Sequence, residues 1–252
     1  MAKLTLLEIV QDILNDMDSD KVSSINDTVE SDQVAQIVKT CYFELIGNRN
    51  WPHLQKLIQL QESGDLAKPN YLVLPDNLKE VTFIKYEKQG LGDSRIVQQD
   101  VKYKYPDDFL RYVSGRNSTA GYVDTIVDYN GSKLLIVNNQ PPTYWTSFDD
   151  VHLVTDAYDA AIDDTLKSSK TQCLAFIEPS WTSSDVFIPD LPMEAFPLLL
   201  AESKSTAFIV LKQMANQKAE QKATRQSAWL SRKAWKAHGG VRYDDYGRKA
   251  RR

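Results

Sequence analysis

The longest uninterrupted pattern in the sequence closes the chain and decides its fold. Residues 194–238 read EAFPLLLAESKSTAFIVLKQMANQKAEQKATRQSAWLSRKAWKAH, with no proline after Pro197 and no glycine before Gly239. Because proline and glycine are the strongest helix breakers, this stretch predicts one long helix over residues 190–238. Such a helix would extend about 65 Å at ~1.5 Å per residue, which exceeds the reach of a compact domain of this size. Residues 217–227 are mostly Lys, Gln, Glu and Ala. We therefore expect the helix to project from its subunit and to be completed by another chain.

Two helices are predicted at the other end of the chain. Thr5 and Glu8 form a capping-box pattern, so the first helix should begin there and run to about Met17. The second helix carries seven apolar residues at spacings of three and one, which places them on one face: Val34, Ile37, Val38, Cys41, Tyr42, Leu45 and Ile46. Pro52 ends it. This apolar face is expected to pack in the core or against another subunit.

The middle of the chain, residues 54–189, is predicted to be rich in β-strands. Short apolar runs at 71–74, 81–86 and 173–177 are bounded by Pro, Gly, Asn and Asp. The clearest hairpin surrounds Asn130-Gly131, a pair that favours a tight type I′ turn. A short helix is expected after Pro106 and should stop at Gly115.

These elements predict an α+β fold. The N-terminal helical pair (residues 1–53) and the long C-terminal helix (190–238) would form a helical layer, with the β-rich region (54–189) between them in sequence. Gly239 and Gly240 would act as a hinge that opens a flexible basic tail, residues 239–252.

Charge is distributed unevenly along the chain. Residues 212–252 contain 12 Lys or Arg and 3 Asp or Glu, a net charge of +9, and the remaining 18 basic and 31 acidic residues give residues 1–211 a net charge of −13. A basic end on an acidic body indicates an acidic partner, which is either nucleic acid or an acidic protein surface. The sequence has no apolar run of ~18 residues and no secretory signal pattern, so we expect a soluble protein without a membrane anchor.

Metal binding is not supported by the residue spacing. The three histidines, His53, His152 and His238, lie far apart, and Cys41 and Cys173 lack the CxxC spacing of a zinc site. Both cysteines are expected to be buried thiols. The sequence therefore predicts no metal site.

Catalysis is also not supported. Adjacent acidic pairs at 149–150 and 163–164 are a poor glycosidase signal, because the two carboxyls of a glycosidase must face each other across a cleft. The sequence contains no GxSxG, P-loop or GxGxxG motif, so we expect neither an enzyme nor a cofactor. Trp51, Trp145 and Trp181 are expected in core or subunit contacts rather than in a sugar-binding surface.

The order of elements and several short motifs resemble the tail tubular protein A family of short-tailed phages, also called head-to-tail adaptors or gatekeepers. The similar features are an opening helix over residues 6–14 (LLEIVQDIL), a second helix ending in NRNW at 48–51, and an LPD segment at 74–76. A long C-terminal helix completes the pattern. The resemblance spans nearly the whole chain, and the β region is longer than in the shorter members of the family.

The resemblance implies a non-enzymatic structural protein of the virion. Its subunits would form a homo-oligomeric ring, usually a dodecamer, at the head–tail junction, after assembly in the host cytoplasm. The helical layer and the tail would contact the portal protein, and the β-rich region would contact the tail nozzle protein. Double-stranded DNA would pass through the ring without sequence-specific contact. The residues expected to dock on the portal are Trp229, Trp235, Arg242, Tyr243, Tyr246, Arg248, Lys249, Arg251 and Arg252.

Two other interpretations of the basic C-terminus stay open at this level. Lysine and arginine release counterions from phosphate, and tryptophan and tyrosine stack on bases, so the segment is also compatible with a nucleic-acid-binding module. It is equally compatible with a solvated tail that has no partner. A cell-wall-degrading tail enzyme is the least supported alternative, because no catalytic constellation is visible.

Overall fold

The computed structural model describes residues 3–48, 50–88 and 96–237, with side chains of the last helix through residue 231. The α+β class is confirmed. The chain forms two compact units, which we call the helical unit (the chain up to Leu54 and from Pro179 onward) and the β unit (Gln55–Glu178). The predicted docking tail, residues 239–252, lies outside the described residues. Within the described residues, no helix is both long and apolar enough to cross a membrane.

The helical unit contains four helices, and its first helix begins as predicted. Its elements are α1 (Leu6–Asp16), α2 (Val29–Gly47), the short η1 (Pro52–Leu54) and η3 (Met193–Ala195), α4 (Phe196–Lys212) and α5 (Gln217–Ala237). The Thr5 hydroxyl accepts a hydrogen bond from the Glu8 N–H at 3.2 Å, and the Glu8 carboxylate accepts one from the Thr5 N–H at 2.8 Å. This is the predicted capping box, which satisfies donors that a helix start leaves unpaired.

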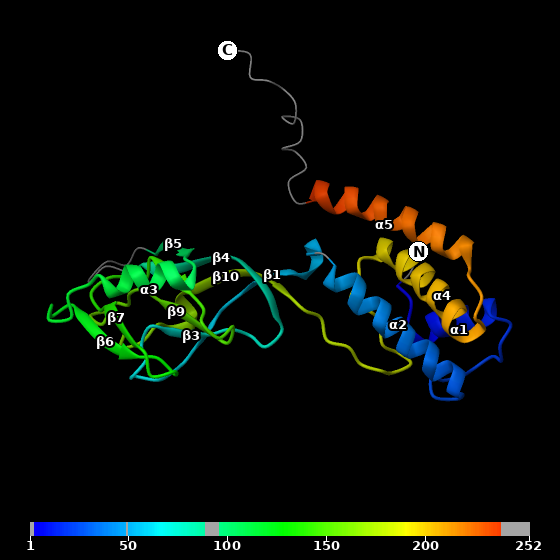
Figure 1. Cartoon of the computed structure of the whole chain (residues 1–252), viewed down its shortest axis with the longest axis horizontal. Coiled ribbons are helices and arrows are strands. Elements are labelled where there is room, and N and C mark those ends of the chain that lie inside the picture. Colours follow the sequence, from blue (N-terminus) through cyan, green and yellow to red (C-terminus); the bar gives the residue numbers. More distant parts are fainter. Residues whose placement is uncertain (1–2, 49, 89–95, 238–252) are drawn as a thin grey trace, which may run out of the picture. The chain divides into compact units, whose positions relative to one another are not determined.

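The prediction of one long C-terminal helix is wrong. The chain leaves α4 at Gln213, whose φ of 54° is left-handed, and α5 then folds back beside α4 (Figure 1). Asn216 begins the new helix, because its side-chain carbonyl accepts the Ala219 N–H at 3.1 Å. α5 also carries its own apolar face, so packing on α4 is more favourable than projecting into water. The expectation that the helix must be completed by another chain because of its length therefore fails.

The segment between the sheet and α4 belongs to the helical unit, although we expected residues up to 189 to belong with the strands. The carbonyl of Phe187 accepts the Leu6 N–H at 2.7 Å, and the carboxylate of Asp185 accepts the Ile25 N–H at 2.8 Å. The ring of Trp181 lies 5.2 Å from that of Tyr42, so this segment covers part of the helices.

The β unit is built on an eight-stranded sheet whose strands follow the order β1-β10-β4-β5-β8-β9-β3-β2. The strands are β1 (Gln55–Ile58), β2 (Gln61–Glu62), β3 (Tyr71–Val73), β4 (Leu78–Lys88), β5 (Val97–Tyr103), β8 (Tyr144–Thr146), β9 (His152–Thr155) and β10 (Thr171–Ile177). Neighbours are antiparallel except β5 and β8, which are parallel. A short η2 (Ser168–Lys170) precedes β10.

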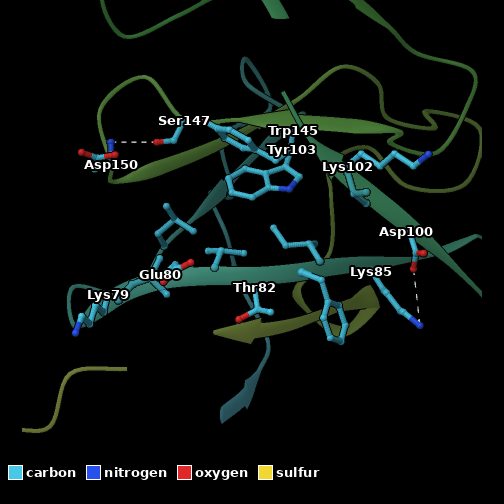
Figure 2. Close-up of a pocket in the computed structure, with 16 residues that line it drawn as sticks. Lys79, Glu80, Thr82, Lys85, Asp100, Lys102, Tyr103, Trp145, Ser147 and Asp150 are labelled. Carbon is cyan, nitrogen blue, oxygen red and sulfur yellow. Dashed lines mark hydrogen bonds and ion pairs between the residues drawn. The ribbon is translucent and has the colours of Figure 1, made fainter. Parts of the chain in front are cut away.

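The sheet divides at β5. This strand pairs with β4 only from Val97 to Val101, and its last residues, Lys102 and Tyr103, pair instead with β8. The first half of β4 therefore diverges from β5, and a groove opens between them (Figure 2). The predicted strands at 71–74, 81–86 and 173–177 correspond to β3, β4 and β10.

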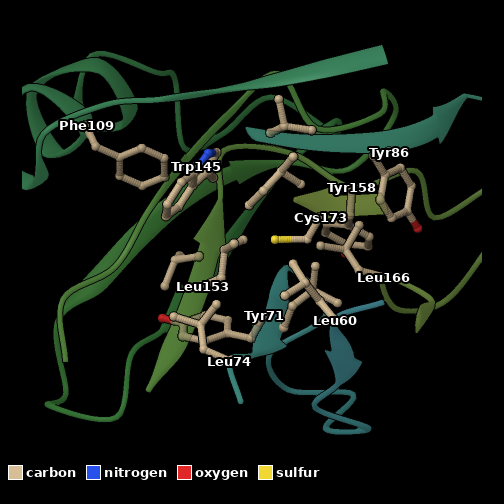
Figure 3. Packing of buried hydrophobic residues seen from close by; sticks show 14 of the residues in the cluster. Leu60, Tyr71, Leu74, Tyr86, Phe109, Trp145, Leu153, Tyr158, Leu166 and Cys173 are labelled. Atoms are coloured by element: carbon tan, nitrogen blue, oxygen red, sulfur yellow. The ribbon is translucent and has the colours of Figure 1, made fainter. Parts of the chain in front are cut away.

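The core of the β unit is a cluster of buried apolar side chains, several of which Figure 3 draws. Its members come from distant parts of the chain, and the most enclosed include Leu60, Tyr71, Phe109, Leu153 and Cys173. Cys41 and Cys173 are both free and buried, which confirms the prediction of buried thiols.

The predicted hairpin and short helix are present, but the turn type is wrong. β6 (Val123–Val127) and β7 (Lys133–Val137) pair around the expected turn, and α3 (Pro106–Ser114) stops at Gly115. In the turn only Gly131 has a positive φ, 81°, and Asn130 does not. Asp128 donates its N–H to Ser132, which gives a three-residue loop rather than a type I′ turn with two left-handed residues.

Candidate functional site

Helix α5 packs on α4 through a narrow face. Ala219, Ala223 and Leu230 are 8%, 3% and 3% exposed, whereas most other described residues of the helix are exposed or half-buried. Two of these three side chains are methyl groups, so α5 lies close to α4. A helix held by so few apolar atoms leaves most of its surface available to a partner.

One flank of α5 carries a basic stripe, which we define as Lys218, Lys222, Arg225 and Trp229. Their spacings of four, three and four residues place them on one side of the helix, about 100° from the packed face. The three cations are exposed, and Trp229 is 48% exposed. In the described part of the chain, no carboxylate forms an ion pair with these three cations. Arg225, Gln226 and Trp229 line a hollow of about 350 Å³.

The opposite flank of α5 borders a groove of about 470 Å³ that we call the acidic groove. Helices α2, α4 and α5 line it with Cys41, Glu44, Leu45, Asn48, Leu198, Glu202, Ala223, Thr224, Ser227 and Ala228. Glu44 and Glu202 are exposed, and no described cation forms an ion pair with either of them. The α5 side of the groove has only small residues, which leaves room for a side chain from another molecule.

The cysteine in this groove does not make it a catalytic site. Burial is the main reason why the pKa of the Cys41 thiol is raised, and the charges of Glu44 and Glu202 raise it further. A thiol is a nucleophile only as its thiolate, so the raised pKa disfavours the reactive form of Cys41. The groove is therefore a candidate for binding rather than for chemistry.

The structure places only part of the predicted docking set. Trp229 lies on the basic stripe, and Trp235 belongs to α5, although its side chain is outside the described part. The hinge and tail residues also lie outside the described part: Gly239, Gly240, Arg242, Tyr243, Tyr246, Arg248, Lys249, Arg251 and Arg252. The prediction missed Lys218, Lys222 and Arg225, although their helical spacing with Trp229 was visible in the sequence.

The β unit holds a larger groove of about 1040 Å³, where β4 leaves β5 (Figure 2). Trp145, 8% exposed, and Tyr103, 49% exposed, lie on the side opposite β4, with ring centroids 4.9 Å apart. Charged residues of both signs line it, and Lys85 pairs with Asp100 at 3.8 Å. Along residues 78–83, β4 pairs with β10 on one side and faces the groove on the other. A groove lined by a strand and by two aromatic rings suits an extended segment of a partner protein.

Most of the remaining sequence candidates make contacts within the fold. The carboxylate of Asp149 contacts the Nδ1 of His152 at 2.6 Å, Asp163 pairs with Lys170, and Asp150 lines the groove of the β unit. Trp51 and Trp145 are 3% and 8% exposed, as expected for core residues. Among the residues that the structure describes, no group of His, Cys, Asp and Glu is arranged to hold a metal ion.

Comparison of the chain with protein-family models found no matching family, and comparison with curated proteins found no match.

Proposed function

We propose that this protein is a subunit of a head-to-tail adaptor ring of a short-tailed phage. It would join the portal protein to the tail nozzle protein and surround the DNA channel, and its role would be mechanical rather than enzymatic. The observation that carries the proposal is the surface of α5. A narrow alanine-rich face holds this helix on α4, while the basic stripe faces outward and the chain continues from it into the basic, aromatic residues 239–252.

The length of the C-terminal helical segment does not require a partner, because α5 folds back beside α4. The helical unit buries an apolar core of its own, although some apolar residues, including Ile209, Val210 and Met214, are exposed. It also exposes positive charge: Lys218, Lys222 and Arg225 have no described ion-pair partner, and residues 212–252 carry a net charge of +9. Exposed charge of one sign steers association with a partner of the opposite sign.

The chemistry of this surface suits an acidic protein groove. Arginine presents a planar fork that binds carboxylates with two parallel hydrogen bonds, and a half-exposed tryptophan supplies a large apolar contact. Arg225 and Trp229 offer both within one turn of α5. The tail beyond Gly240 repeats the same residue types, so we assign the portal contact itself to the tail and the stripe of α5 to assembly of the ring that binds the portal.

The β unit would supply the contact with the nozzle. Its groove is lined by β4 and by the aromatic rings of Tyr103 and Trp145, which together suit an extended segment of a partner protein. DNA would pass without being gripped, because the net charge of −13 on residues 1–211 repels phosphate.

The decisive experiment compares three full-length proteins for binding to the purified portal: the wild type, a deletion of residues 240–252, and Arg225→Glu with Trp229→Ala. We expect both changes to abolish capture, while circular dichroism shows an intact fold. A matched control, Lys88→Glu with Lys133→Glu, changes two exposed cations of the β unit and should bind normally. Portal binding that survives both the deletion and the α5 substitutions rejects the adaptor role.

A nucleic-acid-binding module is the second candidate, because the basic stripe also suits phosphate. Binding to DNA through these cations would weaken steeply as salt rises, because each neutralised phosphate releases a counterion. A mobility-shift titration of the wild type and of Lys218→Glu with Lys222→Glu distinguishes the two candidates. Tight, salt-sensitive binding that the variant loses favours nucleic acid, whereas weak binding that is equal in both proteins favours the adaptor.

A further inference from the structure

The basic stripe and the acidic groove lie on opposite flanks of the same helix. At about 100° per residue, Lys218, Lys222 and Arg225 project to one side of the face that packs on α4. Thr224, Ser227 and Ala228, which line the groove, project to the other side. One flank of α5 is therefore positive, and the other opens toward Glu44 and Glu202.

We propose that a second copy of this chain inserts its basic stripe into the acidic groove, so that neighbouring subunits are joined head to tail. This deepens the proposed function, on which it rests, by assigning the two surfaces that meet within the ring. Lys218, Lys222 and Arg225 of one copy face Glu44 and Glu202 of the next, and Trp229 is the apolar anchor.

The shape of the groove favours a helix as its occupant. Its α5 side consists of Ala223, Thr224, Ser227 and Ala228, whose short side chains let another helix approach closely. The incoming stripe has residues at spacings of four, three and four, which is the pattern of a helix that lies along a groove. The buried Leu198 and the half-buried Leu45 give the groove an apolar component that Trp229 can contact.

Charge also restricts the symmetry of the contact. Two copies that met stripe to stripe or groove to groove would bring like charges together, and like charges repel. When one stripe enters one groove, each pair of subunits keeps one stripe and one groove free. The contact therefore continues from copy to copy until the rotation between neighbours closes a ring.

The test uses charge reversal in the full-length chain, with sedimentation velocity and native mass spectrometry as readouts. The stripe variant is Lys218→Glu, Lys222→Glu and Arg225→Glu, and the groove variant is Glu44→Lys and Glu202→Lys. We expect the wild type to self-associate and each variant alone to weaken self-association roughly 100-fold or more, because like charges then meet. All five positions are exposed, so the fold should be unaffected.

Mixing the two variants is the discriminating step. The reversed stripe of one variant matches the reversed groove of the other, and their unchanged surfaces also match, so the equimolar mixture should recover assembly with the variants alternating. A chain that carries both reversals should also self-associate. The control, Lys88→Glu with Lys133→Glu, makes a similar change in net charge and should assemble like the wild type.

Several results would overturn the inference. These are a wild type that stays monomeric at every concentration, assembly that is insensitive to either reversal, and a mixture that does not recover. Loss of DNA binding in the stripe variant, with assembly unchanged, would assign the stripe to nucleic acid instead. Portal capture is measured separately on the same proteins: a ring that does not bind portal refutes only the adaptor role, and portal binding without self-association refutes only this contact.

Discussion

The main-chain N–H of Met214 donates a hydrogen bond of 3.2 Å to the carbonyl oxygen of Phe208, across the left-handed residue Gln213. The N–H of Gln213 donates to the same carbonyl. These bonds satisfy an acceptor that the end of α4 would otherwise leave unpaired, and they turn the chain back along its own helix. The turn places the basic stripe on the side of α5 rather than on a projecting helix.

Replacing the left-handed residue tests this turn. A side chain at a φ of 54° is strained, and glycine adopts this conformation without strain, so Gln213→Gly should raise the free energy of unfolding by up to about 1 kcal/mol. Gln213→Val should lower it, because a β-branched side chain tolerates positive φ least. Urea denaturation of both variants measures the effect. A glycine variant that is less stable than the wild type would contradict the left-handed turn.

The β unit depends on a buried ion pair between Arg116 and Asp156. The carboxylate of Asp156 is fully buried, accepts the N–H groups of Thr143 at 2.9 Å and Tyr144 at 2.8 Å, and pairs with the Arg116 guanidinium at 3.2 Å. Asp156→Ala leaves three part-buried donors without this acceptor and should cost about 3–5 kcal/mol in urea unfolding. Asp156→Asn should cost less, since its carbonyl oxygen still accepts the two main-chain bonds. Equal losses in the two variants would contradict this role.

The capping box of α1 can be tested at one position. Thr5→Ala removes the hydroxyl that accepts the Glu8 N–H, and it should lower the free energy of unfolding by about 1 kcal/mol. Thr5→Ser keeps an equivalent hydroxyl and should change stability by no more than a few tenths of a kcal/mol. Thermal melts followed by circular dichroism at 222 nm compare them. A serine variant as unstable as the alanine variant would show that the loss of stability does not come from the missing hydroxyl.

The buried Tyr86 should make stability fall in alkaline solution. Burial raises the pKa of Tyr86 to about 12, against the hydrogen bond that its hydroxyl accepts from the Lys167 N–H. The folded chain thus holds this proton more tightly than the unfolded chain, in which tyrosine titrates near pH ~10. The contribution is fully present below pH ~10 and is lost as the pH rises from about 10 to about 12.

The measurement is the free energy of unfolding as a function of pH for the wild type and for Tyr86→Phe. Across this window the wild type should lose on the order of 2 kcal/mol more than the variant, which has no hydroxyl proton to lose at this position. At neutral pH the variant should be slightly less stable, because the Lys167 N–H loses its acceptor. Parallel curves for the two proteins above pH ~10 would contradict the raised pKa of Tyr86.

The groove of the β unit can be probed without damage to the core. Tyr103 is 49% exposed, so Tyr103→Ala should leave the fold intact and weaken binding to the nozzle protein roughly tenfold, as expected for an aromatic contact. Trp145→Ala would not separate binding from folding, because that side chain is buried. The control is Tyr122→Ala, since Tyr122 is 53% exposed and is not among the residues that line the groove. Equal affinities for the Tyr103 and Tyr122 variants, measured by biolayer interferometry, would exclude this groove as the contact.

Short sequence motifs correctly predicted the ends of helices, because residues close together in the chain decide where a helix begins and ends. The capping box at Thr5, the proline that opens α3 and the glycine that ends it act over a few residues, so the sequence reveals them directly. The Asn130-Gly131 pair correctly predicted the position of the hairpin but not the type of its turn, because the turn type also depends on the register of β6 against β7. Trp229 was predicted to be a docking residue from its position. The groove that contains Glu44 and Glu202 was not predicted, since these residues lie far apart in the chain.

By itself, the sequence determined the fold class, the positions of the first helix and of the hairpin, and the excess of positive charge after residue 211. It placed the end of the second helix at Pro52, whereas α2 ends at Gly47 and Pro52 begins η1. Only the tertiary structure decided that α5 folds back on α4 and that the sheet divides at β5. The physical reason is the range of the forces involved. Helix propensity is nearly the same on both sides of Gln213, and the turn is favoured because α5 packs on α4 and buries Ala219, Ala223 and Leu230. Burial of this kind depends on which residues meet in space, and the order of residues along the chain does not state it.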